Sequence, residues 1–82
     1  MEIVKYAGKT CHNCRRLEKL LETMTLTCEV KTLYIEEVDP DILDKEGVHT
    51  LPTLIFTNEG KRESISGIIS KGQIEDCIKA VS

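Results

Sequence analysis

The chain has 82 residues, of which 40% are hydrophobic and 4% aromatic, and its net charge at pH 7 is -3. This composition suits one small domain over residues 1–82, and a mild negative charge without a basic run gives no sign of nucleic-acid binding. The N-terminus has no basic segment followed by a long apolar stretch, so we expect neither a signal peptide nor a membrane span. We therefore expect a cytoplasmic protein whose thiols are kept reduced.

The first half of the chain predicts a strand, a helix and a second strand. β-Branched and aromatic residues over 2–6 favour a strand, and apolar residues at helical spacing predict a helix over 13–24. The run from Cys28 to Ile35 predicts a second strand. A strand–helix–strand unit of this length is a right-handed crossover, so the two strands should be parallel.

The middle of the chain predicts a short helix followed by a hairpin. Pro40 suits the first turn of a helix that ends near Gly47, with Asp39 as its N-cap. Strands are predicted at 51–57 and 61–66, and the residues between them, 58–60, have the composition of a hairpin turn.

The last predicted element is a helix capped by Ser70. Its inner face carries apolar residues at helical spacing: Ile74, Cys77, Ile78 and Val81. The order βαβ-α-ββα predicts an α/β fold with a four-stranded mixed sheet flanked by helices on both faces. The first two strands should be parallel and the others antiparallel.

Cys11 and Cys14 stand where the first strand and its turn lead into the first helix. A helix leaves its first N–H groups unpaired, and these groups and the helix dipole favour an anion. Cys11 should therefore ionise more readily than a free thiol. The two-residue spacer lets the two sulfurs meet across the first helical turn, so one sulfur can capture the other. This arrangement predicts thiol–disulfide chemistry.

The same Cys-x-x-Cys spacing also begins many zinc sites. A closed site needs two more ligands, and the candidates Cys28, His49 and Cys77 are scattered along the chain. A metal or iron–sulfur carrier using Cys11 and Cys14 is the alternative, while the strand–helix context favours redox chemistry with no metal and no cofactor. Among the other cysteines, Cys77 is expected to pack in the core, and Cys28 lies near an element boundary.

Polar residues near the two cysteines are candidates for tuning their reactivity. A partly charged His12 would stabilise the Cys11 thiolate, and the equally good alternative is a solvated spacer. Lys9 and Arg15 would add positive potential to a thiolate, and they could attract an acidic partner or the carboxylates of glutathione. The ordinary alternative for these cations is a solvated helix face.

A third motif joins the two cysteines, since Pro52 precedes a predicted strand. A strand, Cys-x-x-Cys at a helix start and a proline before a strand resemble the pattern of the thioredoxin family. Residues 47–54 resemble the family's cis-proline segment, and residues 67–74 resemble its glycine-then-helix segment. The resemblance covers essentially the whole chain, which lacks the extra N-terminal strand and helix of full-length thioredoxins.

The resemblance implies a thioredoxin fold and a thiol–disulfide oxidoreductase. In that reaction the Cys11 thiolate attacks a substrate disulfide and Cys14 resolves the mixed disulfide. The resemblance also implies a cis bond at Pro52 and a substrate-binding segment made of Thr50, Leu51 and Pro52. The partners expected are disulfide-containing proteins, with a thioredoxin reductase or glutathione as the electron source, and the protein should be a monomer without a bound cofactor.

Three positions depart from the family pattern. Thr10 replaces the tryptophan before the first cysteine, His12-Asn13 replaces Gly-Pro, and Lys5 stands where thioredoxins carry a buried acid. Because burying an unpaired cation is costly, we expect the Lys5 ammonium to reach solvent along its stem. Of the glycines and aspartate that hold glutathione in glutaredoxins only Gly67 remains, which favours a thioredoxin-like protein. A glutathione-dependent glutaredoxin-like reductase is kept as the second alternative.

Overall fold

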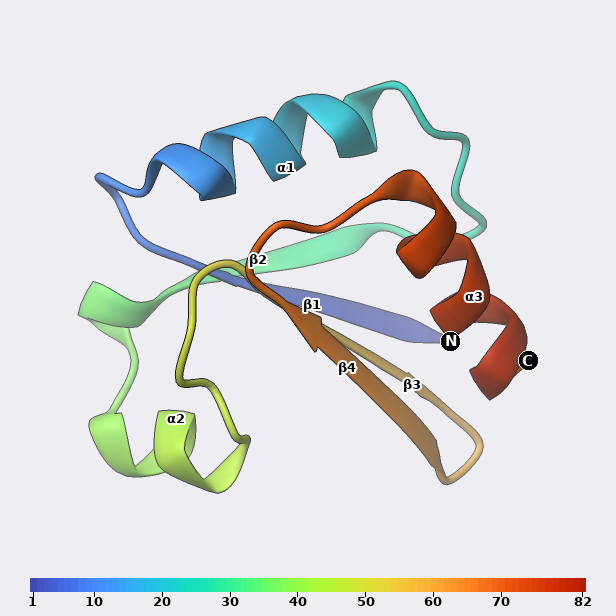
Figure 1. Cartoon of the computed structure of the whole chain (residues 1–82). Helices are drawn as coiled ribbons and strands as arrows, with labels where there is room; N and C mark the ends of the chain where they lie inside the picture. The colour runs from blue at the N-terminus through green and yellow to red at the C-terminus, as the bar shows by residue number, and fades with distance from the viewer.

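The computed structural model describes residues 1–82. Its elements in chain order are β1 (Glu2–Ala7), α1 (His12–Glu22), β2 (Val30–Tyr34), the 3-10 helix η1 (Ile35–Glu37), α2 (Pro40–Lys45), β3 (Thr53–Asn58), β4 (Lys61–Ser66) and α3 (Lys71–Val81). The strands form one four-stranded sheet in the order β2-β1-β3-β4. Helices α1 and α3 lie over one face of the sheet and α2 lies on the other side (Figure 1).

The strand directions are those predicted from the sequence. β1 pairs with β2 in parallel and with β3 antiparallel, and β3 pairs antiparallel with β4. The parallel pair follows from the α1 crossover, because a helix must carry the chain back before the second strand can start. The α/β fold and its mixed sheet are therefore confirmed. No helix is long and apolar enough to cross a membrane.

The core lies between the sheet and the two helices that share its face. It is a cluster of buried side chains from β1, β3, α1 and α3: Ile3, Leu17, Leu54, Phe56, Ile74, Cys77 and Val81. Phe56 pairs with Ile3 across the β1–β3 ladder, and Leu54 pairs with Lys5. Opposed residues of an antiparallel pair point to the same side, so Lys5 stands on the core face of β1.

The predicted caps and hairpin are confirmed. The Asp39 side chain accepts a hydrogen bond from the Asp41 N–H at 2.9 Å and so caps α2. Ser70 caps α3. In the hairpin turn Glu59 and Gly60 have φ of 50° and 84°, which is the left-handed geometry that two-residue hairpins require.

Several predicted boundaries were wrong by one or two residues. The helix expected over 13–24 is α1, which begins at His12 and ends at Glu22. β2 begins at Val30 rather than at Cys28. Val30 pairs with Ile3, and β1 starts only one residue before Ile3, so Cys28 has no residue of β1 to pair with. β3 begins after Pro52, since proline has no N–H to give to the ladder.

Candidate active site

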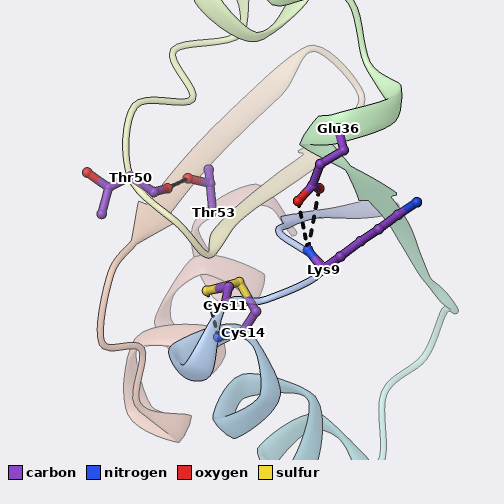
Figure 2. Close-up of a disulfide and its surroundings, with 6 residues drawn as sticks. All are labelled: Lys9, Cys11, Cys14, Glu36, Thr50 and Thr53. Carbon is purple, nitrogen blue, oxygen red and sulfur yellow. Dashed lines mark hydrogen bonds between the residues drawn. A yellow bond between two sulfur atoms is a disulfide. The ribbon is translucent and has the colours of Figure 1, made fainter.

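The first helix begins at a disulfide between Cys11 and Cys14, with the two Cα atoms 5.2 Å apart. Cys11 has extended backbone geometry and is the N-cap residue of α1. Its Sγ accepts a hydrogen bond from the Cys14 N–H at 3.1 Å (Figure 2). The sulfur therefore lies where an N-cap oxygen usually lies, facing N–H groups that have no partner within the helix.

The two sulfurs differ in their access to solvent. Cys11 is half-buried, whereas Cys14 is buried with 5% of its surface exposed. Leu17, the next residue along this face of α1, belongs to the hydrophobic core. Cys14 is therefore at the boundary between the core and the site, and Cys11 is the cysteine that a partner in solution can reach.

The turn before the helix brings a second loop against the cysteines. The Cys11 N–H donates to the carbonyl of Gly8 at 3.3 Å. A Cβ on Gly8 would lie 3.0 Å from Leu51 Cδ1 and 3.4 Å from Cys11 Cβ. A side chain at this position would press against Leu51, so the turn before α1 and the loop that contains Leu51 touch beside the disulfide.

The loop before β3 has the geometry expected from the sequence. The Leu51–Pro52 bond is cis, Pro52 is buried, Leu51 is half-buried and Thr50 is exposed. The Thr53 Oγ1 hydroxyl donates to the Thr50 carbonyl at 2.6 Å (Figure 2). The Pro52 carbonyl accepts from the Gly67 N–H at 3.0 Å, so the β4–α3 loop is fixed to the cis-proline loop.

A groove runs between α1 and the β4–α3 loop. It encloses about 280 Å³ and is lined by Asn13, Arg16, Leu17 and Leu20 of α1 and by residues 67–71. Ile68, on its rim, has 75% of its surface exposed. Ile68 therefore presents an apolar side chain at a groove that is also lined by Asn13, the residue before Cys14.

Comparison with known protein families agrees with this arrangement of the two cysteines and the cis-proline loop. A family model for the thioredoxin domain matches residues 1–79. The chain belongs to the thioredoxin family. No curated protein matches it in sequence.

Solved thioredoxins have the same fold. Thioredoxin 1 from Thermosipho africanus TCF52B superimposes with a TM-score of 0.77 at 17% sequence identity, covering 96% of this chain and 91% of its own. Thioredoxin from Fasciola hepatica gives a TM-score of 0.75 at 20% identity, covering 95% of this chain and 78% of its own. Chloroplastic thioredoxin z gives 0.70 at 23% identity, covering 96% and 75%. At these identities the likeness shows the fold.

An acidic pair beside the site was missed in the sequence. The Glu36 carboxylate accepts the Lys9 N–H at 3.1 and 3.4 Å (Figure 2), and Glu37 lies 3.8 Å from Lys9 Nζ. The parallel pairing of β1 and β2 explains this contact, because the carboxyl ends of parallel strands meet at one edge of the sheet. The residues after β2 therefore hold the turn that leads to Cys11.

Lys9 remains a candidate for adding positive potential to a thiolate. Its ammonium lies within ion-pair distance of Glu37 and its side chain is 56% exposed, so the field that it projects toward the sulfurs is partly cancelled and screened. His12 is exposed at the first position of α1. His49 is also exposed.

Lys5 has a buried stem, and its ammonium keeps the access to solvent that was expected. Only 6% of its surface is exposed, so this access is narrow. Lys5 lines a cavity of about 140 Å³ together with Cys14, Arg15 and Glu18. Lys5 forms no ion pair. No fully buried nitrogen or oxygen of a side chain lacks a hydrogen-bond partner, so the ammonium borders the open part of this cavity.

The structure brings no third metal ligand to the two cysteines of the motif. No group of three or more histidine, cysteine or acidic side chains is close enough to hold a metal ion. Cys77 is part of the hydrophobic core and Cys28 packs against it, and both are free thiols. The ligands that a closed zinc site would require are therefore dispersed within this chain.

Proposed function

We propose that this chain reduces disulfide bonds in proteins, with Cys11 as the nucleophile and Cys14 as the resolving thiol. The observation that carries the proposal is the contrast between the two cysteines. Cys11 is half-buried and its sulfur accepts an N–H hydrogen bond at the start of α1, whereas Cys14 is buried. An N–H donor and a helix N-terminus both stabilise a thiolate, so Cys11 would be the reactive group in the reduced protein.

The proposed reaction has two exchange steps. The Cys11 thiolate attacks one sulfur of the substrate disulfide, forming a mixed disulfide and releasing the other substrate sulfur as a thiolate. Cys14 then loses its proton and attacks the Cys11 sulfur, and the second substrate sulfur leaves. The products are a dithiol substrate, which has gained two electrons, and the Cys11–Cys14 disulfide. No bound cofactor takes part.

The surface around the disulfide supports an extended substrate chain. Thr50 is exposed beside the cis-proline bond, and an extended peptide could add to the backbone of Thr50 and Leu51 as a further strand would. Leu51 and Ile68 would contact the apolar side chains of that peptide. Pro52 would support the segment from beneath, because it is buried and bonded to Gly67.

The partners and setting are also proposals. Electrons would come from a thioredoxin reductase or from glutathione, and the protein would act as a single domain and a monomer on disulfide-containing proteins. The free thiols of Cys28 and Cys77 suit a reducing compartment such as the cytoplasm.

The test is reduction of insulin disulfides with dithiothreitol as the electron source. We expect the wild type to accelerate the reaction and the Cys11→Ser variant to have no activity above background. A Cys14→Ser variant should accumulate mixed disulfides through Cys11, and Cys28→Ser is the matched control that should behave as the wild type. Full activity in Cys11→Ser would overturn the proposal.

A second measurement separates this function from the metal-carrier alternative. Freshly purified protein is examined for metal content and visible absorbance, and the insulin assay is repeated with a thioredoxin reductase or with glutathione and its reductase. Stoichiometric metal with no reductase activity would favour the carrier. The better of the two reductants identifies the electron donor.

A further inference from the structure

We propose that Lys5 is a positioning residue that promotes the resolving step by stabilising the thiolate of Cys14. The inference rests on the proposed function, because it assigns a role within the second exchange step. A cation would then do by electrostatic attraction what a proton acceptor would do by removing the thiol proton.

The first observation is where Lys5 lies. It stands on the core face of β1 opposite Leu54, which is fully buried, and only 6% of its own surface is exposed. A lysine is rarely buried to this extent without a charged partner, and Lys5 has none. In the oxidised protein its ammonium therefore has no anionic partner.

The second observation is what Lys5 shares its cavity with. The cavity of about 140 Å³ is lined by Lys5 and by Cys14, the sulfur that must ionise for resolution. In the disulfide this sulfur is neutral. In the mixed disulfide with substrate it is a free thiol, and its ionised form would give the enclosed ammonium the anionic partner that it otherwise lacks.

The other charged and titratable groups around this cavity do not take over that role. They are Lys9, Arg15, Glu18 and Tyr34, and all are exposed. Lys9 lies within ion-pair distance of Glu37. Exposed charges are screened by water and salt, and enclosed charges are screened much less. Lys5 is therefore the least screened of the charged groups that line this cavity.

The step balances without a proton acceptor in the protein. The Cys14 thiol gives its proton to water that enters the cavity, and Lys5 keeps its own proton throughout. The Cys14 thiolate attacks the Cys11 sulfur, the Cys11–substrate S–S bond breaks, and the substrate sulfur leaves as a thiolate. Negative charge thus moves from Cys14 to the product, and the attraction of Lys5 for Cys14 ends when the disulfide has formed.

The expected size follows from two opposing effects. A nearby opposite charge lowers a pKa by about one to three units, so removing the Lys5 charge should raise the Cys14 pKa by about one unit or more. For each unit by which the Cys14 pKa rises, the fraction of Cys14 that is thiolate at neutral pH falls about tenfold. Each thiolate becomes about threefold more nucleophilic, because nucleophilicity rises with pKa. The net result is resolution about threefold slower at neutral pH.

The same reasoning predicts a reversal at high pH. Above both pKa values the thiol is fully ionised in wild type and variant alike, so only nucleophilicity differs. The variant should then resolve about threefold faster than the wild type. A general loosening of the site would slow resolution at every pH and would give no reversal.

The experiment uses the reduced full chain and the aromatic disulfide dithiobis-nitrobenzoate in stopped flow. Cys11 releases the first thionitrobenzoate and forms the mixed disulfide, and Cys14 releases the second, whose rate is measured from neutral to strongly alkaline pH. Lys5→Met should shift the midpoint of this profile upward by about one unit or more, and Lys5→Arg should restore it. Lys31→Met, an exposed lysine on the adjacent strand β2, is the matched control and should leave the profile unchanged.

The outcomes separate this inference from the proposed function. Second-phase release in the wild type together with an unshifted midpoint in Lys5→Met would overturn the role of Lys5 and leave the exchange reaction standing. Absence of the second release in the wild type would overturn the proposed function, and this inference with it. Thermal unfolding of each variant establishes that it is folded, and Lys5→Gln replaces Lys5→Met if the latter is not.

Discussion

Helices α1 and α3 lie on the same face of the sheet and have 11 residues each, but their N-termini are capped in different ways. α3 begins with a reciprocal capping box, in which Ser70 Oγ accepts the Gln73 N–H at 3.3 Å and Gln73 Oε1 accepts the Ser70 N–H at 2.8 Å. α1 begins with the sulfur of Cys11 alone, which accepts one N–H at 3.1 Å.

The difference shows how one position can serve structure or chemistry. A capping box satisfies two unpaired N–H groups and stabilises the helix. Sulfur is a weak acceptor when it is neutral, and hydrogen bonds to an ionised acceptor are about twice as strong. The N-terminus of α1 is therefore matched to a thiolate rather than to the disulfide, so reduction strengthens the cap of α1 and leaves that of α3 unchanged.

The largest expected effect comes from exchanging the cap atom of α1. Serine caps helices well, so Cys11→Ser should keep the fold, with an unfolding free energy within about 1 kcal/mol of the reduced wild type. Disulfide reduction should be lost completely, because a hydroxyl is not a redox group. Urea unfolding and the insulin assay on one preparation measure both quantities. A large loss of stability would mean that α1 needs sulfur for its structure.

His12 tests whether the N-terminus of α1 is tuned by its first side chain. It is exposed at the first helical position, where proline is well accommodated, so His12→Pro removes the imidazole without breaking the helix. We expect a higher Cys11 pKa and a more reducing protein. A tenfold change in the exchange equilibrium corresponds to about 30 mV.

The measurement for His12 is a titration of thiolate absorbance together with equilibration against a glutathione buffer. His12→Gln keeps a polar, neutral side chain and separates the loss of the imidazole from the change in backbone. If the potential and the Cys11 pKa are unchanged in both variants, His12 is a solvated spacer.

The converse change is made at α3. Ser70→Ala removes the acceptor for the Gln73 N–H and should cost about 1 kcal/mol of unfolding free energy. Insulin reduction should stay at the wild-type rate, because Ser70 is a structural cap. Gln73→Ala removes the other half of the box and should cost less. A loss of activity at unchanged stability would show that Ser70 contacts the substrate.

Of the two caps only Ser70 was predicted as one, from residue preference at helix starts. Cys11 was predicted to stand near the start of the first helix, from the join of a strand, a turn and apolar helical spacing. The strand directions were predicted as well, since the crossover fixes the first pair and the turn at 58–60 fixes the last. These features depend on residues close together in the chain.

The contacts that were not predicted join distant parts of the chain. Glu36 reaches the Lys9 N–H only because β1 and β2 end side by side. The strand pairing was predicted, and this consequence could have been drawn from it. The burial of Lys5 could not have been predicted in the same way. The alternation of side chains along a strand tells which face of the sheet Lys5 is on, but not how completely neighbouring side chains cover it.

The last prediction concerns the reactivity of the buried free cysteine, Cys77, in the middle of α3. It has 7% of its surface exposed, and burial raises the pKa of its thiol above the ordinary value of 9.0, with Glu63 and Asp76 adding to the shift. This is the opposite of what a helix N-terminus does to Cys11. At neutral pH an alkylating reagent should therefore modify Cys11 of the reduced protein first and leave Cys77 unmodified until the chain unfolds.

The pKa of Cys77 also predicts how stability changes with pH. Because the pKa is raised in the folded state, the unfolded chain loses this proton first as the pH rises. The associated stability is complete below about pH 9 and is lost as the pH rises toward the folded pKa, with a slope of at most about 1.4 kcal/mol per pH unit. Urea unfolding at neutral and alkaline pH measures this loss of stability.

Two cysteine variants isolate the contribution of the Cys77 thiol. Cys77→Ala should be less stable at every pH because it leaves a cavity, but its unfolding free energy should fall less steeply above about pH 9 than that of Cys28→Ala. Equal slopes in the two variants would mean that the Cys77 thiol ionises as readily in the folded protein as in the unfolded chain.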